Sequence, residues 1–204
     1  YVGLVAAACF SEMGNEVTCI DVDIKKIDNL KKGKVPIYEP GLSQLVIENQ
    51  NKKTLFFSTD IKLALENTAV VFIAVGTPMG DDGSADMQYA LNVASSIGKN
   101  LSDHIVIVNK STVPIGTAEK VRDVIQKELD ERSSSVTFDV VSNPEFLKEG
   151  VAISDFMHPD RVVVGSSNEE SMNLMRTLYS PFTLSSDRFI AMDIRSAEMT
   201  KYAA

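Results

Sequence analysis

The chain has 204 residues, which is enough for one domain with its own apolar core. Hydrophobic residues make up 44% and charged residues 24%, ordinary values for a globular protein. Twenty Lys and Arg against 28 Asp and Glu give a formal net charge of −8, which argues against a nucleic-acid-binding or anionic-membrane-binding surface. The two cysteines, Cys9 and Cys19, are too few for a disulfide framework and indicate a reducing compartment.

Neither end of the chain reads as a targeting or membrane segment. No apolar run approaches the ~20 residues of a membrane span, and the start lacks the basic region of a signal peptide. We therefore expect a cytoplasmic protein. The sequence begins partway through the expected fold and ends halfway along a helical pattern. We therefore expect about a dozen residues before Tyr1 and further chain after Ala204.

The first part of the chain alternates helices with short strands. An Ala-rich segment, residues 3–13, predicts a helix that ends at Gly14, and residues 16–21 predict a short buried strand. The next expected elements are a helix around 24–30, a helix beginning at Pro40, a strand at 55–57 and a helix capped by Asp60.

Residues 69–75 are apolar throughout, which is typical of a strand covered on both faces in a parallel sheet. Further along the chain, the expected elements are helices at 86–97, 117–132, 169–179 and 196–204 and strands at 105–108, 138–141, 161–165 and 188–192. This alternation predicts an α/β fold with a doubly wound, Rossmann-like parallel sheet. Residues 1–195 form the expected domain, and the helix from 196 leads out of it.

Gly3 and Asp21 fit two positions of a dinucleotide-binding site. Such a fold begins with a strand, Gly-x-Gly-x-x-Gly and a helix, followed by an acidic residue about 20 positions on. Gly3 fits the third glycine, and Asp21 ends the next strand, where a carboxylate accepts ribose hydroxyls and favours NAD over NADP. Lys26 could cover the adenosine side. The alternatives are that Gly3 is a packing position and Asp21 a turn or helix cap.

The first strand of that fold would precede Tyr1. In the usual strand order it lies in the middle of the sheet, between the strands that contain Val17 and Phe72. We therefore expect those two strands to be separated by roughly two strand spacings, ~9–10 Å.

A set of motifs carries a more specific resemblance. They occur in order at residues 1–4 (YVGL), 35–42 (VPIYEPGL), 75–78 (VGTP), 110–117 (KSTVPIGT), 143–150 (NPEFLKEG), 159–161 (PDR) and 197–202 (AEMTKY). The chain resembles, over nearly its whole length, the N-terminal NAD-binding part of the UDP-glucose/GDP-mannose dehydrogenase family.

The resemblance implies an NAD-dependent oxidation of UDP-glucose to UDP-glucuronate in two steps, as in the supply of uronic acid for polysaccharides. A cysteine in a later Gly-Gly-Ser-Cys segment, outside this chain, would carry the thiohemiacetal and thioester. Cys9 and Cys19 are expected to be inert core thiols, because apolar burial suppresses the thiolate. The fragment alone is expected to be inactive, and the full-length protein a homodimer.

Three other functions stay open on the sequence. The substrate could be another nucleotide sugar, a UDP-N-acetylhexosamine or GDP-mannose. The protein could be a 3-hydroxyacid dehydrogenase, which needs no cysteine. It could also be a non-catalytic NAD-binding module.

The resemblance also assigns site residues. Glu145 would activate water as a general base, Lys201 would stabilise the oxyanion at the sugar carbon, and Thr112 would orient a water near the nicotinamide. The cofactor would contact Tyr1, Val2, Gly3, Asp21, Lys26, Thr77, Thr112 and Glu149. The sugar would contact Glu145, Phe146, Leu147, Lys148 and Lys201.

Each of these assignments has a purely structural alternative. Thr112 could only shape the turn before Pro114. Glu145 and Glu149, four residues apart, could lie on an exposed helical face. Lys201 could form a surface pair with Glu198.

No metal site is expected. The acidic segment 81–86 lacks the spacing of a calcium loop and is expected to be a turn followed by a helix cap. His104 and His158 are isolated and have no cysteine partners.

Overall fold

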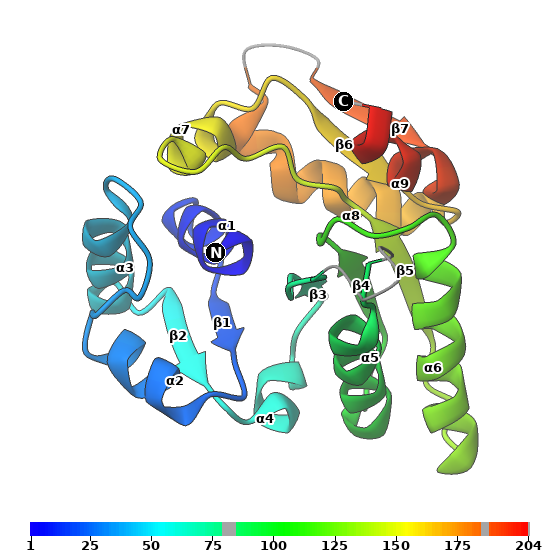
Figure 1. Ribbon diagram of the computed structural model, residues 1–204. Coiled ribbons are helices and arrows are strands. Elements are labelled where there is room, and N and C mark those ends of the chain that lie inside the picture. The colour runs from blue at the N-terminus through cyan, green and yellow to red at the C-terminus, as the bar shows by residue number, and fades with distance from the viewer. Residues whose placement is uncertain (79–84, 185–187, 204) are drawn as a thin grey trace.

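The computed structural model describes residues 1–78, 85–184 and 188–203 (Figure 1). The helices are α1 (Val2–Glu12), α2 (Ile24–Lys31), α3 (Leu42–Asn51), α4 (Ile61–Leu65), α5 (Gln88–Asn100), α6 (Thr117–Glu131), α7 (Ala152–Met157), α8 (Glu169–Tyr179), the 3-10 helix η1 (Ser180–Phe182) and α9 (Ile194–Ala203). The strands are β1 (Val17–Ile20), β2 (Leu55–Ser58), β3 (Val70–Ile73), β4 (Ile105–Asn109), β5 (Phe138–Ser142), β6 (Val162–Gly165) and β7 (Phe189–Met192). The predicted α/β class is confirmed.

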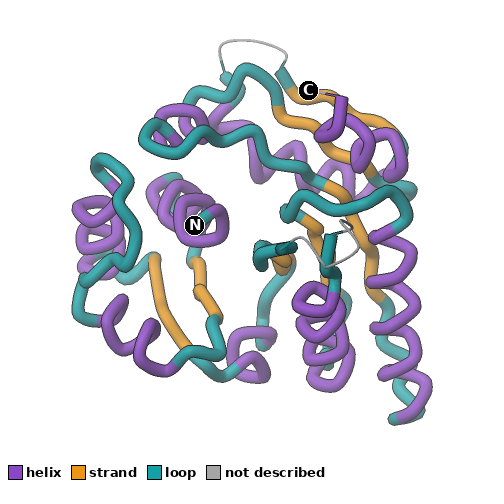
Figure 2. Tube along the Cα trace, in the orientation of Figure 1, coloured by secondary structure: helices purple, strands orange, loops and turns teal. Residues whose placement is uncertain are grey.

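The strands form two separate sheets, which Figure 2 shows as two groups. β1 and β2 pair in parallel, and the larger sheet has the order β3-β4-β5-β6-β7. β1 and β3 are therefore not paired with each other, as expected for the strands that contain Val17 and Phe72. The width of the separation stays a prediction.

The larger sheet differs from the sequence prediction at two places. β5 pairs with β6 in antiparallel orientation at Ser142 and Gly165, whereas the other pairs are parallel. Antiparallel neighbours can be joined at one end of a sheet, and the loop and short α7 between β5 and β6 do so. β3 is an edge strand, so Val70, Val71 and Phe72 are only half-buried rather than covered on both faces.

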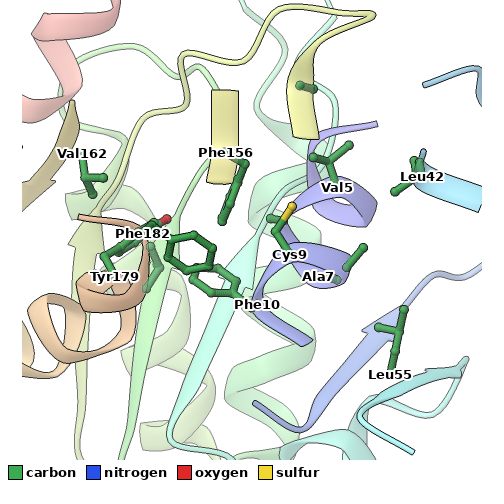
Figure 3. Packing of buried hydrophobic residues seen from close by; sticks show 14 of the residues in the cluster. Val5, Ala7, Cys9, Phe10, Leu42, Leu55, Phe156, Val162, Tyr179 and Phe182 are labelled. Atoms are coloured by element: carbon green, nitrogen blue, oxygen red, sulfur yellow. The ribbon is translucent and has the colours of Figure 1, made fainter. Parts of the chain in front are cut away.

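Helices cover both faces of the larger sheet. One apolar cluster joins α5 and α6 to the sheet, and the other joins α1, α7 and α8 to it. An aromatic group forms the centre of the second cluster (Figure 3). Phe10 of α1 has its ring centroid 5.1 Å from that of Phe156 and 5.2 Å from that of Tyr179.

Several helix ends have the predicted caps. Asp60 accepts a hydrogen bond from the backbone N–H of Leu63 and so caps α4, as expected. Asp86 accepts from the N–H of Gln88 at the start of α5, although the cap position itself is Met87. Residues 81–84 of the acidic segment lie outside the described residues.

The start of α6 is capped by a side chain from another helix. The Thr117 hydroxyl donates to the carbonyl of Pro114 and does not cap the helix. Instead, the carboxylate of Glu198 in α9 accepts from the N–H groups of Gly116 at 2.6 Å and Ala118 at 2.8 Å. Glu198 is only 2% exposed, so the structural alternative for Lys201, a surface pair with Glu198, is wrong.

Gly165 in β6 lets α9 lie directly on the sheet. A Cβ built at Gly165 would be 2.6 Å from Cβ of Ala197 and 2.8 Å from the carbonyl oxygen of Asp193, which is closer than real side chains pack. This contact and the Glu198 cap fix α9, and α9 carries Lys201.

Candidate active site

The ends of β3 and β4 are held together at the carboxyl edge of the sheet. The hydroxyl of Thr77, after β3, donates to the carbonyl of Thr112, after β4, at 2.9 Å. The Ser111 hydroxyl donates to the carbonyl of Val75 at 2.7 Å. Open α/β sheets bind their ligands at this edge. Thr77 and Thr112, which are both expected to contact the cofactor, are thus brought together.

Glu145 and Lys201 are in direct contact. Lys201 Nζ donates to the backbone carbonyl of Glu145 at 2.6 Å and to its Oε1 at 3.0 Å. The other carboxylate oxygen, Oε2, accepts from the N–H of Leu147 at 2.7 Å. Both side chains are largely buried, 13% exposed for Glu145 and 23% for Lys201. The helical-face alternative for Glu145 is wrong, because residues 143–149 form a loop.

Two cations lie near the ring of Phe146. The guanidinium of Arg161 is 4.3 Å from its ring centroid, and Lys201 Nζ is 5.4 Å from it. A cation over an aromatic face is attracted by the negative face of the ring. Leu147 packs against the apolar core, whereas Lys148 is mostly exposed and pairs with Asp155 at 3.9 Å.

The N-terminus of α1 lies against the end of β3. A Cβ at Gly3 would be 3.2 Å from Cβ of Ala74, so the glycine permits α1 to approach the end of β3 closely. This role fits the third glycine of the dinucleotide-binding motif. The alternative interpretation of Gly3, as a residue required only for helix packing, is equally consistent with its close contact with Ala74. Since Ala74 directly follows β3, the start of α1 and Thr77 lie at the same edge of the larger sheet.

Glu39 connects the start of α1 to the loop after β5. Its carboxylate accepts hydrogen bonds from the Tyr1 hydroxyl and from the N–H groups of Gly150 and Ala152, the latter two at 2.8 Å. Burial alone would raise the pKa of Glu39, but these hydrogen bonds outweigh burial and lower it. Glu149, next to Gly150, is thereby held near Tyr1.

A hollow of about 560 Å³ lies beside this connection. Tyr1, Glu149 and Gly150 line it together with Ile37 and the exposed Tyr38. Two predicted cofactor contacts, Tyr1 and Glu149, therefore face one hollow.

Asp21 follows β1, and its side chain forms two contacts. Oδ1 accepts from the N–H of Asp23 at 3.0 Å, and Oδ2 pairs with Lys26. Burial raises the pKa of Asp21, but the Lys26 ammonium and the Asp23 N–H outweigh it, so the pKa is lowered overall. Asp23, not Asp21, caps α2.

Charged side chains from two parts of the chain lie near the start of α1. Asp21 and Lys26 follow β1 and Glu149 follows β5, and all three lie near the backbone nitrogen of Tyr1. The remaining lysines of α2 and the turn after it are exposed and form a solvated face.

The two cysteines have no part in this arrangement. Cys9 is fully buried in α1, and burial raises its pKa to about 12. Burial likewise raises the pKa of Cys19 in β1 to about 12. A thiol needs its thiolate to act as a nucleophile, so neither cysteine is suited to the chemistry.

The described residues contain neither a metal-binding cluster nor a membrane-spanning helix. No group of three His, Cys, Asp or Glu side chains there could hold a metal ion. His104 contacts the hydroxyl of Thr137 at 2.9 Å and lies 3.8 Å from Asp139. None of the helices in the described ranges combines the length and the apolar character needed to cross a membrane.

Residues 1–183 match the family model described as UDP-glucose/GDP-mannose dehydrogenase family, NAD binding domain. The chain belongs to this family. It is 47% identical over its whole length to a UDP-glucose 6-dehydrogenase of Pseudomonas aeruginosa and 48% identical to the UDP-glucose 6-dehydrogenase TuaD of Bacillus subtilis. It covers 45% and 43% of those proteins, so the chain spans a little under half the length of these relatives.

Solved structures of the dehydrogenase family have the same fold. A UDP-glucose dehydrogenase from the archaeon Pyrobaculum islandicum superposes with a TM-score of 0.90 at 37% identity, over all of this chain and 46% of that one. A GDP-mannose dehydrogenase from Pseudomonas aeruginosa, solved as a ternary complex, gives 0.89 at 37% identity, over all of this chain and 47% of that one.

The residues at the start of α1 fit the NAD of this family. Gly3 allows the helix to approach β3 closely, and an α-helix N-terminus offers free N–H groups to a pyrophosphate. The partly exposed carboxylate of Asp21 is an acceptor suited to ribose hydroxyls. Tyr1, Val2, Gly3 and Asp21 would hold the adenosine end, with Lys26 beside it.

The sequence reading did not single out several residues that organise this dehydrogenase site. Glu39 lies in the motif at 35–42 and Arg161 in the motif at 159–161, so each was within a quoted motif but had no assigned role. Glu198 was considered only as a surface partner of Lys201. Lys110, which is buried after β4, had no assigned role either.

Proposed function

We propose that the protein is the NAD-binding part of an enzyme that oxidises the primary alcohol of UDP-glucose to the carboxylate of UDP-glucuronate. The observation that carries this proposal is the contact of Lys201 with Glu145, 3.0 Å between Nζ and Oε1, beside the strand ends that present Thr112. A fixed ammonium can stabilise an oxyanion, and a fixed carboxylate can take a proton from water. The oxidation needs both the stabilisation of an oxyanion and the removal of a proton from water.

Each residue has a place in the proposed reaction. The oxidation removes two hydrides from the sugar carbon, one to each of two NAD⁺ molecules that would bind in turn, and it adds one oxygen from water, whose protons are released. Lys201 stabilises the negative charge that develops on the sugar oxygen. Glu145 takes the proton of the attacking water, and the Thr112 hydroxyl orients a water in the same place. Asp21, Thr77 and Glu149 fix the cofactor, while Phe146, Leu147 and Lys148 border the sugar.

The covalent part of the reaction would use a thiol from outside residues 1–204. Cys9 is buried and Cys19 partly buried, and burial raises the pKa of both thiols too far for either to supply it. We expect the working protein to be a cytoplasmic homodimer.

UDP-glucose is favoured over the other nucleotide sugars by the relatives. The two compared above, at 47% and 48% identity, are named UDP-glucose 6-dehydrogenases, whereas the compared GDP-mannose dehydrogenase is 37% identical. The motifs that resemble the family support a nucleotide sugar rather than a 3-hydroxyacid.

The test measures NADH formed by the intact natural protein with excess NAD⁺ and a limiting amount of each sugar. We expect two NADH for each UDP-glucose and far slower turnover of GDP-mannose and UDP-N-acetylglucosamine. One NADH for each sugar would contradict the four-electron oxidation. A preference for another nucleotide sugar would overturn the choice of substrate, and NAD binding without turnover of any of them would favour the non-catalytic module.

A further inference from the structure

A buried polar cluster lies directly beneath the proposed site. It consists of Lys110, which follows β4, Asn143, which follows β5, and Tyr179, the last residue of α8; we call these three residues the buried triad. Each is between 1% and 4% exposed. Figure 3 shows Tyr179 among the aromatic side chains of the core, beside Phe10 and Phe182.

Hydrogen bonds join all three members of the triad. The Tyr179 hydroxyl donates to Asn143 Oδ1 at 2.6 Å. Lys110 Nζ donates to the same Oδ1 at 3.2 Å and to the Tyr179 hydroxyl oxygen, also at 3.2 Å. Asn143 Oδ1 therefore receives two donors, and its position depends on both of the other side chains.

The triad also connects neighbouring strands of the sheet. Asn143 Nδ2 donates to the carbonyl of Val163 in β6 at 2.8 Å, and the Asn143 N–H donates to the carbonyl of Asn109 in β4 at 2.9 Å. The Lys110 N–H donates to the carbonyl of Ile73 in β3 at 3.0 Å. The cluster thus fixes four adjacent strands at the points where the loops of the site begin.

Burying the ammonium group of Lys110 at this position costs free energy. Within the described residues, no carboxylate oxygen lies within hydrogen-bond distance of its ammonium; its nearest neighbours include the rings of Phe156 and Tyr179, with centroids 5.5 and 5.8 Å away. Burial lowers the pKa of Lys110 to about 8, while the charge of Glu145 raises it and that of Lys201 lowers it. An apolar side chain would pack there at lower cost. The charge therefore calls for a role other than core stability.

We propose that Lys110 is a positioning residue of the dehydrogenase site, which fixes Asn143 and thereby aligns Glu145 with Thr112. The inference rests on the proposed function. Lys110 stands two residues before Thr112, and Asn143 stands two residues before Glu145, so the hydrogen bond between them joins the starts of the two loops. A small displacement of a general base from its reacting position lowers the rate strongly without abolishing binding.

The experiment compares three variants of the intact natural protein. K110M keeps most of the length of the side chain and removes its charge and donors. Y179F keeps the ring and removes only the hydroxyl that donates to Asn143. L129A is the matched control, because Leu129 is fully buried in α6, in the apolar cluster that contains none of the triad. It lowers stability without touching the triad.

Kinetics and hydrogen exchange are measured on all three variants below their melting temperatures. We expect K110M to lower kcat about tenfold or more, Y179F to lower it less, and the KM for NAD⁺ to stay within about twofold. L129A should lower the melting temperature and leave kcat unchanged. The amides of residues 111–116 and 143–149 should exchange faster in K110M and Y179F than in L129A.

Two results would overturn the positioning role. The first is that K110M and Y179F have the same kcat as the wild type. The second is that L129A loses as much kcat as K110M and Y179F do when all three variants have lost the same amount of melting temperature. If K110M does not fold, Y179F decides by the same criteria. If the wild type does not oxidise UDP-glucose, the proposed function fails while the exchange of residues 111–116 and 143–149 still reports whether the triad orders the two loops.

Discussion

Glu198 and Ala118 are 80 residues apart, yet the carboxylate of Glu198 accepts the Ala118 backbone N–H at 2.8 Å. A second N–H, that of Gly116, donates to the other carboxylate oxygen at 2.6 Å. The first turn of α6 is therefore capped by a side chain from α9. Because Glu198 lies one helical turn before Lys201, the same cap holds the lysine in register with the sheet.

Replacing Glu198 with alanine should destabilise the protein. The substitution leaves two N–H groups without acceptors in a buried place, which costs about 2 kcal/mol or more in the free energy of unfolding. Urea denaturation of the intact protein measures the loss. Glu119 provides a matched control, since its exposed side chain in the same first turn pairs only at 3.7 Å with Arg195. E119A should change stability by less than about 0.5 kcal/mol. Equal losses in the two variants would contradict the capping role.

Replacing Gly165 with alanine should displace α9 from the sheet. The added methyl would meet Cβ of Ala197 at 2.6 Å and the backbone of Asp193 and Ile194 at 2.8 Å, and such overpacking costs about 1–3 kcal/mol. Lys201 moves with the helix, so kcat should fall as well. G76A is the control, because a Cβ at Gly76 meets no heavy atom within 4 Å. Unchanged stability of G165A would show that α9 is not packed against β6 in this way.

Asp21 should matter for NAD binding and its near neighbour Asp23 should not. Loss of a charged hydrogen bond to the ribose costs about 1.5–3 kcal/mol, so D21A should weaken NAD⁺ binding by about tenfold or more. Asp23 caps α2 and stands two residues further along, and D23A should lower stability with little effect on affinity. Titration of the intact protein with NAD⁺, followed by calorimetry, distinguishes the two variants. Equal affinities of D21A and the wild type would remove Asp21 from the cofactor site.

Lys110 should give the protein a distinctive dependence of stability on pH. The pKa of Lys110 is about 8 in the folded state, whereas that of an ordinary lysine side chain is 10.5, so between pH 8 and 10.5 the unfolded chain binds more protons. Stability therefore rises with pH across this window, by about 3 kcal/mol in total for the full shift. The charged and titratable groups that face Lys110 are Glu145, Lys201 and Tyr179.

K110M isolates this contribution. The buried thiols, with pKa values raised by burial, lower stability at high pH, but they are present in both proteins and cancel in the difference. Denaturant unfolding of wild type and K110M at a series of pH values from 7 to about 10 gives the comparison. Wild type should gain stability relative to K110M as the pH rises, and a constant difference would refute the buried ammonium.

Glu145 and Lys201 should act as a coupled pair. E145Q and K201M should each lower kcat of the intact protein, and the double variant should be little worse than the poorer single one, because each residue positions the other. K127M is the control, since Lys127 is exposed on α6 and, in the part of the chain that the structure describes, pairs with Glu131 alone at 3.8 Å. Fully additive losses would mean that the two residues act independently.

Local patterns predicted the elements well, and long-range contacts account for what they missed. The helix at 169–179 and the strand at 138–141 follow from apolar spacing alone, and the structure confirms both. The short α7 escaped detection, because six residues carry too little periodicity. The predicted parallel orientation of β6 was wrong, because a buried apolar strand has the same sequence pattern in parallel and antiparallel pairs.

The site residues likewise fall into those that local sequence patterns predict and those that depend on long-range contacts. Gly3 and Asp21 could be found from the spacing of one fold, because the backbone itself sets that spacing. Glu145 and Lys201 came only from the family resemblance, since their contact spans 56 residues. Lys110 and Glu198 read as ordinary charged residues, and only the folded chain shows that one is buried among aromatic rings and the other caps a helix.

The most direct test of the account is a crystal structure of the intact protein with NAD⁺ and UDP-glucose. The account predicts that the adenosine ribose contacts the Asp21 carboxylate while the nicotinamide lies between Thr112 and Glu149. It also predicts that the sugar carbon lies within reach of Glu145 and Lys201. A cofactor that extends away from the loop after β5, or a sugar that touches neither Glu145 nor Lys201, would contradict it.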